Sequence, residues 1–367
     1  MPESSSHFRL IGALREEFSA LSFSGPTASL AFRTALASVL SLIAAMALHL
    51  DNPYWAAITA VSIIQPEVSA TFLRSVDRCL GTIAGAAVGY FGARFVDDHL
   101  IFQLIVASAV AFGVYGAQRS RHGYAVLLGA VTVILVMFGA LEAPDAALRL
   151  AVYRSLEIMV GVGVTFLVEF AASTPGDNAP SAEMPGIFAT PIDVELLAIG
   201  VTGGLAAASI PAIWENLQLP GLGQTPITAF VIVVAMRSEP IMKALNRLVG
   251  CVLGGVYGLF CMHFVDDNMM LWLFLLCAGL YVASHVKHGG GEAAYSGHQA
   301  AIAVIMSMAY GLAPSPNILP AVNRLVGIIG GMVVVLTAQA LIAPFVMSAL
   351  SNAFNRSGEA AQVKARS

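Results

Sequence analysis

Runs of about 20 apolar residues recur along nearly the whole chain, and they limit the possible folds more than any other feature. A helix of about 20 residues has the length that crosses the hydrocarbon core of a bilayer. Only 11% of the 367 residues are charged and 57% are hydrophobic, whereas a soluble domain carries about 25% charged residues. Because the chain has too few charges to cover a water-soluble surface, the sequence predicts an all-α polytopic membrane protein.

The apolar runs, separated by turn and charge signals, predict about twelve transmembrane helices in two groups of six. The first group is 32–50, 54–65, 80–96, 101–117, 124–141 and 148–171. The second group is 194–213, 226–236, 248–265, 269–284, 300–312 and 322–346. The corresponding organisation is a cytoplasmic amphipathic segment (1–28), a first membrane repeat (29–172), a cytoplasmic linker (173–193), a second membrane repeat (194–346) and a cytoplasmic tail (347–367).

Basic residues predict the orientation of these spans. With the N-terminus inside the cell, 14 of the 18 Lys and Arg residues fall in cytoplasmic segments. We therefore expect both termini in the cytoplasm and the acidic pairs at 97–98 and 266–267 on the opposite side. Before residue 28 there is no apolar stretch of a cleavable signal, and one apolar face predicts a short helix in the membrane interface. That face consists of Phe8, Ile11, Leu14, Phe18 and Leu21.

An internal repeat relates the two halves. When 77–98 is shifted by 169 residues onto 246–267, nine of the 22 positions are identical without a gap, against roughly two by chance. Six helices per half is an even number, so both halves enter the membrane from the same side as parallel repeats. Glycines at every fourth position make smooth helix faces, and we expect them to form packing seams rather than to contact substrate. They are Gly81, Gly85, Gly89, Gly250, Gly254 and Gly258.

Three stretches carry a resemblance to a known family. They are 52–59 (NPYWAAIT), Gln65-Pro66, and 78–82 (RCLGT) followed by Gly85 and Gly89. Together they resemble the fusaric acid resistance family, whose relatives include bacterial aromatic acid exporters and, more distantly, plant malate-channel proteins. The resemblance is strong over 33–91 and weaker over 224–265.

The resemblance implies a transporter of the bacterial inner membrane that moves aromatic or other organic carboxylates, often with a periplasmic adaptor protein as partner. Larger exporters of this kind carry sizeable soluble cytoplasmic regions between and after their membrane halves. In this sequence the linker at 173–193 is short by comparison.

The second span of each half is unusually short. The first ends at Gln65, before a proline, and its counterpart ends near 236. Matched interrupted segments point to the binding site of a transporter, although re-entrant packing without a ligand gives the same pattern. Arg78 and Arg247 open the spans that follow. They either snorkel to water or face the axis as a pair suited to bidentate capture of a carboxylate.

Arg154 and Arg324 occupy equivalent positions 170 residues apart, and we expect both to lie one or two helical turns inside the membrane. An arginine at mid-helix costs about 2.5–3.5 kcal/mol on insertion, so such residues usually face the bundle interior. Glu157 is spaced for an ion pair with Arg154, whereas the second half has Gly327 there. Either this is a structural ion pair, or Arg324 receives a substrate anion and Glu157 is a protonatable coupling group.

Three further residues are weaker candidates, and two of them have two interpretations each. Trp55 either belongs to an interfacial aromatic belt or contributes to substrate binding. His298, with Tyr295 beside it, begins the eleventh span, where it is either a boundary residue or a second proton-coupling candidate. Glu169, near the end of the sixth span, is expected to be solvated.

The sequence contains no nucleotide-binding loop, no nucleophile–base motif and no His/Cys cluster at metal spacing. We therefore expect no enzyme, no cofactor and no metal, and the lack of a basic stripe argues against nucleic acid. The expected function is gradient-driven efflux of a small anionic solute through the lipid bilayer, most simply coupled to protons. A passive organic-anion channel and a non-transporting scaffold or adaptor-binding subunit remain as alternatives.

Overall fold

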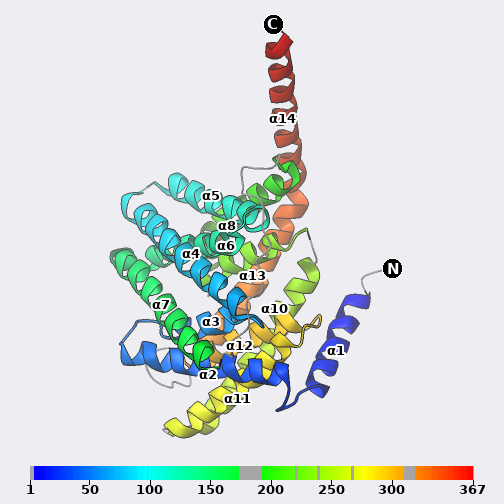
Figure 1. The fold of residues 1–367 in the computed structure, drawn as a ribbon. Coiled ribbons are helices and arrows are strands. Elements are labelled where there is room, and N and C mark those ends of the chain that lie inside the picture. Colours follow the sequence, from blue (N-terminus) through cyan, green and yellow to red (C-terminus); the bar gives the residue numbers. More distant parts are fainter. Residues whose placement is uncertain are drawn as a thin grey trace.

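The computed structural model describes residues 4–96, 98–172, 192–219, 222–237, 240–265, 268–309 and 319–366. Within these ranges the chain is helical and has no strand (Figure 1). The first half contains α1 (Ser4–Ser19), α2 (Pro26–Ala47), α3 (Tyr54–Ile63), α4 (Val68–Phe95), α5 (His99–Arg119), α6 (Gly123–Glu142) and α7 (Ala147–Ala172). The second half contains α8 (Val194–Leu217), α9 (Thr225–Val234), α10 (Pro240–Val265), α11 (Met269–His288), α12 (Ala294–Met308), α13 (Leu319–Leu341) and α14 (Ala343–Arg366). Short 3-10 segments, Pro144–Ala146 and Leu222–Gln224, precede α7 and α9.

Eight of the described helices are long and apolar enough to cross a membrane: α2, α5, α6, α7, α8, α10, α11 and α13. This confirms the predicted class, an all-α polytopic membrane protein, while the number of twelve spans stays a prediction. Most of the predicted linker, 173–193, and the acidic pair at 266–267 lie outside the described residues. The predicted tail, 347–367, falls almost entirely in α14, which projects from the bundle in Figure 1.

The two short segments expected from the sequence are the helices α3 and α9. Each has ten residues and is therefore about 15 Å long, half the thickness of the hydrocarbon core. Every residue of α3 except Trp55 is buried, and α9 is also mostly buried. A helix that is apolar all round packs in the interior of a bundle, so both short helices lie inside the protein and not against lipid.

The helices of the two halves interlock. Within each half α4 packs against α6 and α10 against α12; between the halves α5 packs against α8, and α11 against α2. One apolar core joins α2 and α3 to α10, α11 and α12, around Leu42, Ile58 and Trp272. A second core joins α5 and α6 to α8, α9 and α13, around Phe138 and Phe230. These reciprocal contacts are the ones that a twofold relation between parallel halves would produce.

The regularly spaced glycines lie where α4 approaches α6 and where α10 approaches α12. A Cβ atom added to Gly85 would lie 2.9 Å from the Cα atom of Gly129, and one added to Gly250 would meet the backbone of α12 in the same way. Small residues let helix backbones approach closely in a membrane. These two glycine faces therefore set the distance of α4 and α10 from their neighbours, and α4 and α10 carry Arg78 and Arg247.

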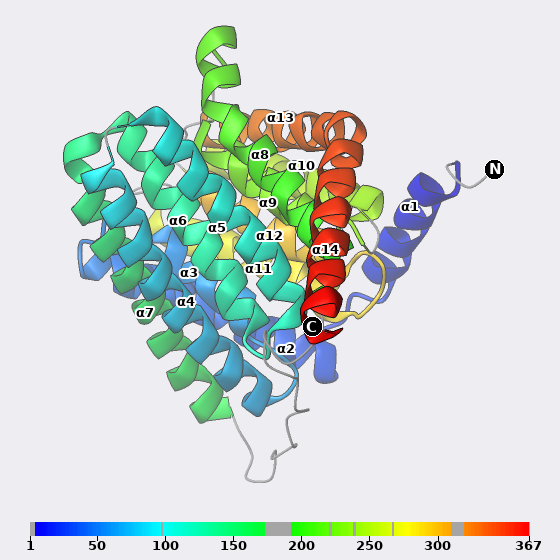
Figure 2. The ribbon, with the colours of Figure 1, turned by 90° about the horizontal axis from the view of Figure 1, so that it is seen from above.

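The N-terminal helix α1 lies at the edge of the bundle, beside α10 and α11 (Figures 1 and 2). Leu10 packs against Met242, Val286 and Ala293, which makes it the buried anchor of α1. Phe18 remains exposed on the apolar face predicted from the sequence. This combination of a docked side and an exposed apolar side suits a helix at the membrane interface.

Candidate functional site

Three cationic side chains from three helices contact the short helix α3 along its length. Arg154 of α7 lies over the ring of Trp55 in the first turn of α3, with 3.5 Å between the guanidinium carbon and the ring centre. In the middle, Arg78 of α4 donates to the hydroxyl of Thr59 at 3.1 Å. At the C-terminal end, Lys287 of α11 donates to two backbone carbonyls. Positively charged side chains thus lie along the whole length of α3.

Lys287 stabilises the end of α3 because the last carbonyls of a helix have no intrahelical donor and carry partial negative charge. Its ammonium donates to the carbonyl of Ile64 at 3.2 Å and to that of Val61. Gln118 precedes Lys287 by 169 residues, and it donates to the carbonyl of Val234 at the end of α9 at 3.0 Å. The C-terminal end of each short helix is therefore capped by a side chain of the other half: charged Lys287 caps α3, and neutral Gln118 caps α9.

Arg78 and Arg247 are buried, with 4% and 5% of their surface exposed, so neither snorkels to water. Arg78 donates to the hydroxyl of Tyr124 at 2.9 Å, and Arg247 donates to that of Tyr295 at 3.4 Å. Both tyrosine rings also lie under a second cation: Arg74 is 5.1 Å from the ring centre of Tyr124, and Lys243 is 4.5 Å from that of Tyr295. Each half thus holds one tyrosine between two basic residues of one helix.

His298 of α12 lies among these cations. Its ring has Arg74, Arg78, Arg247 and Lys287 within electrostatic range, two from each half. Its Nδ1 atom is buried and has no hydrogen-bond partner among the described residues. Basic residues of both halves thus converge toward His298.

A cavity of about 210 Å³ opens between the start of α3 and the first half of α7. Trp55, Tyr153, Arg154 and Glu157 line it. Among the described residues, neither the Nε nor the Nη1 atom of Arg154 has a hydrogen-bond partner. Glu157 is buried, and its carboxylate accepts from the backbone N–H of Asn52 at 2.7 Å. The cavity therefore presents a guanidinium with unused donors beside aromatic rings and one buried carboxyl group.

Arg324, the counterpart of Arg154, has different surroundings. It donates to the amide oxygen of Gln299 at 3.0 Å, to the sulfur of Cys251 at 3.2 Å and to that of Met306 at 3.2 Å. Gln299 also accepts from Arg247 at 3.2 Å. The second half therefore ties its two arginines together through one amide, whereas the first half leaves Arg154 with unused donors.

Among the described residues, none of the four arginines has a carboxylate within ion-pair distance, although the carboxyl group of Glu157 lines the same cavity as Arg154. Arg78, Arg154, Arg247 and Arg324 are each at most 7% exposed. The ion pairs within the described part of the chain involve Arg9, Arg33, His122, Arg149 and Arg237 as cations, and none of these four. Because a buried charge without a partner is costly, this arrangement favours an anion in the interior.

The remaining predicted residues lie at the edges of this site. Gln65 follows α3, and its side-chain amide donates to the carbonyl of Ile64 at 2.7 Å, so it lies beside Lys287. The expectation that Glu169 is solvated is wrong: it is 1% exposed and forms an ion pair of 3.0 Å with Arg33. The physical reason is that α7 packs against α2 along this stretch, which removes the helix end from water.

Sequence reasoning missed Lys287, Tyr124 and Gln299 as parts of the site, and it named Tyr295 only beside His298. The two tyrosines follow the repeat, 171 residues apart, and that signal was available in the sequence. Lys287 stands at the end of an apolar run and resembles an ordinary cytoplasmic charge. Its position against α3 depends on a contact between residues more than 200 positions apart.

The fold and these interior charges define the class of protein: a polytopic α-helical membrane protein with two short internal helices and four buried arginines that form no ion pair within the described ranges. Residues 28–183 match the model of the fusaric acid resistance protein family, and residues 205–338 match that of a fusaric acid resistance protein-like family. Together these matches cover most of the chain. The chain belongs to the fusaric acid resistance protein family.

Two curated relatives illustrate the similarity. The chain is 28% identical over 141 residues to the "Uncharacterized transporter YdhK" of Escherichia coli K12, which covers 36% of this chain and 20% of that protein. It is 28% identical over 145 residues to the "UPF0421 protein YgaE" of Bacillus subtilis 168, which covers 39% of each. The chain thus matches well under half of the length of either relative. No solved structure matches it.

Proposed function

We propose that the protein is a transporter of the bacterial inner membrane that exports small organic anions, with aromatic carboxylates as the principal substrates. The observation that carries this proposal is the set of four buried arginines, none of which has a carboxylate at ion-pair distance among the described residues. A carboxylate substrate would supply the missing negative charge, and arginine binds carboxylates through two parallel hydrogen bonds.

The row of cations along α3 supports a path for this anion. From Trp55 to Ile64 the helix rises about 14 Å, nearly half of the hydrocarbon core, and Arg154, Arg78 and Lys287 are distributed over this length. With the orientation predicted from the basic residues, Lys287 lies toward the cytoplasm and Arg154 toward the periplasm. An anion would enter among Lys287, Arg78 and Arg247 and leave through the Arg154 cavity.

The aromatic lining of that cavity supports the substrate class. Trp55 and Tyr153 lie beside Arg154, so a planar ring can stack while its carboxylate meets the unused guanidinium donors. Glu157 and His298 are the proposed proton-coupling groups, because one is a buried carboxyl group beside Arg154 and the other lies among the cations. In this scheme an incoming proton neutralises Glu157 as the anion leaves.

Other parts of the proposal rest on the family or on the distribution of basic residues in the sequence. Fusaric acid resistance proteins suggest a periplasmic adaptor as partner, and the basic residues suggest that both termini lie in the cytoplasm. Neither feature bears on how an anion would bind. They are therefore separate from the test below.

Proteoliposomes that contain the purified protein test the function. We expect the vesicles to take up a radiolabelled benzoate-type carboxylate when the proton gradient across their membrane is directed outward. A protonophore, which removes this gradient, should abolish the uptake. The variant Arg78→Gln should raise KM about tenfold or more, because a hydrogen bond to a charged group contributes about 1.5–3 kcal/mol. Arg94→Gln, on the exposed face of the same helix α4, is the matched control and should transport normally.

The same assay separates the alternatives. Flux that continues unchanged with the protonophore assigns a passive anion channel instead of a pump. Complete absence of flux for every organic carboxylate, in protein that is folded and inserted, assigns a non-transporting scaffold. Normal KM in Arg78→Gln would contradict the proposed cationic path in either case.

A further inference from the structure

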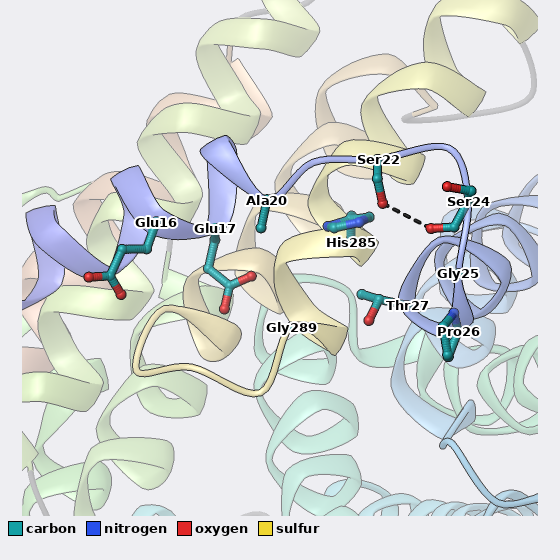
Figure 3. Close-up of a pocket in the computed structure, with 10 residues that line it drawn as sticks. All are labelled: Glu16, Glu17, Ala20, Ser22, Ser24, Gly25, Pro26, Thr27, His285 and Gly289. Atoms are coloured by element: carbon teal, nitrogen blue, oxygen red, sulfur yellow. Dashed lines mark hydrogen bonds between the residues drawn. The ribbon is translucent and has the colours of Figure 1, made fainter.

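A polar cavity outside the arginine site lies where α1, the turn after it, and the start of α2 meet the end of α11 (Figure 3). Its volume is about 270 Å³. Glu16 and Glu17 extend from α1 at one side, and Thr27 of α2 lies at the other, as Figure 3 shows. His285 of α11 lies between them. Nothing in the proposed transport path uses these residues.

The two sides of this cavity have opposite electrostatic character. Two carboxylates stand on the α1 side, and the carboxylate of Glu17 lies so close to Gly289 that a Cβ atom there would collide with it. On the other side α2 begins at Pro26 without a side-chain cap. The first N–H groups of a helix have no intrahelical acceptor and carry partial positive charge. A ligand that satisfies both sides carries a cation and an anion.

His285 provides independent evidence for a ligand. Its side chain is 3% exposed, and neither of its ring nitrogens has a hydrogen-bond partner among the described residues. Buried polar side chains are normally hydrogen-bonded. An imidazole that lines the cavity with both nitrogens unused therefore marks a position where a polar group of a ligand can bind.

The position of the cavity predicts that it lies near lipid headgroups. It is formed at the ends of two candidate membrane spans, Pro26–Ala47 and Met269–His288. Next to it Phe23 is 89% exposed and stacks on Tyr281, as aromatic side chains do at a membrane interface. The helices α1 and α11 also line an apolar groove of about 400 Å³, with Phe18 and Val282 among its residues. A polar cavity and an apolar groove bounded by the same two helices suit an amphipathic ligand.

We propose that this cavity binds the headgroup of a zwitterionic phospholipid of the phosphoethanolamine type. The ammonium lies against Glu16 and Glu17, and the phosphate accepts hydrogen bonds from the first turn of α2 and from His285. An anionic lipid is disfavoured by the two carboxylates, and a simple amine leaves the helix end and the imidazole without an acceptor. A choline headgroup has no N–H to donate to the carboxylates.

Lipid retention by the purified full-length protein tests the proposal. The protein is exchanged into nanodiscs that contain equal amounts of phosphatidylethanolamine, phosphatidylcholine and phosphatidylglycerol, extracted into detergent, and analysed by native mass spectrometry. We expect phosphatidylethanolamine to be retained at least tenfold over either other lipid. Equal retention of the three lipids by the wild-type protein would overturn the proposal, and this result does not depend on any variant.

Variants connect the retention to the cavity. Glu16→Gln combined with Glu17→Gln, and separately His285→Phe, should each remove the preference. Glu215→Gln, an exposed carboxylate of α8, is the matched control and should preserve it. Unchanged preference in both cavity variants would contradict the assignment of the site.

Free phosphoethanolamine distinguishes a lipid headgroup from a soluble zwitterion as the ligand of the cavity. Free phosphoethanolamine should raise the melting temperature of the detergent-solubilised protein less than phosphatidylethanolamine does at the same concentration. If the free compound stabilises the protein and the lipid does not, the ligand is a soluble zwitterion and the lipid proposal fails. Transport activity plays no part in either readout, so failure here leaves the proposed function untouched.

Discussion

Arg154 and Arg324 occupy equivalent positions of the two halves, yet the structure gives their guanidinium groups different surroundings. Arg324 uses its donors on Gln299, Cys251 and Met306. Arg154 lies over an aromatic ring and has two nitrogens without a hydrogen-bond partner in the described part of the chain. The substitutions Arg154→Gln and Arg324→Gln should therefore separate substrate binding from protein stability.

The expected magnitude follows from these contacts. A hydrogen bond to a charged group contributes about 1.5–3 kcal/mol, and 1.36 kcal/mol corresponds to a tenfold change. If Arg154 donates to the bound carboxylate, Arg154→Gln raises KM about 10- to 150-fold and changes the melting temperature little. Arg324→Gln removes hydrogen bonds of that kind within the protein, so its cost appears as a lower melting temperature.

Carboxylate uptake into proteoliposomes gives KM, and thermal unfolding in detergent gives the stability of the same preparations. Arg94→Gln serves as the control in both measurements. One of the two interpretations from the sequence made Arg324 the anion receptor, and that stays a prediction which this experiment decides. A large increase in KM for Arg324→Gln, with normal transport by Arg154→Gln, would refute the reasoning from hydrogen bonds.

Three further predictions concern stability and carboxylate uptake. Gly85→Ala should destabilise the protein by about 1–3 kcal/mol, because the added Cβ atom meets backbone at the α4–α6 contact. Gly163→Ala should not, because the space around Gly163 is open. Equal melting temperatures of these two variants would contradict the prediction. Lys287→Met should lower carboxylate uptake more than Lys287→Arg, because the charge at the end of α3 is lost; equal uptake by both variants would contradict it. The backbone N–H of the first turn of α8, and then Arg237, hold the pKa of Asp193 below its usual range. Ionised Asp193 therefore stabilises the fold above the unfolded pKa of about 3.9, and this stabilisation is lost as the pH falls through the lower pKa of the folded state. The melting temperatures of wild type and Asp193→Asn should accordingly converge in acid. A constant difference between them from pH 7 to pH 3 would contradict this prediction.

Local sequence was sufficient for the class of protein and for its interrupted helices. The predicted short spans 54–65 and 226–236 correspond to α3 and α9 within two residues at each end. Prolines and apolar length act on the chain segment that contains them, so they can be interpreted without knowing any neighbour. The wrong expectation for Glu169 shows the limit, because its burial depends on the packing of α7 against α2.

The sequence by itself determined that this chain crosses a membrane many times, that its halves resemble each other, and that basic residues lie near or within the spans. Only the tertiary structure decided which of these charges are buried, which have partners, and that Lys287 meets the end of α3 from the other half of the chain. The physical reason is the distance along the chain over which each property is determined. Hydrophobicity and helix interruption are properties of a segment, whereas the surroundings of a charge are set by helices far away in the sequence.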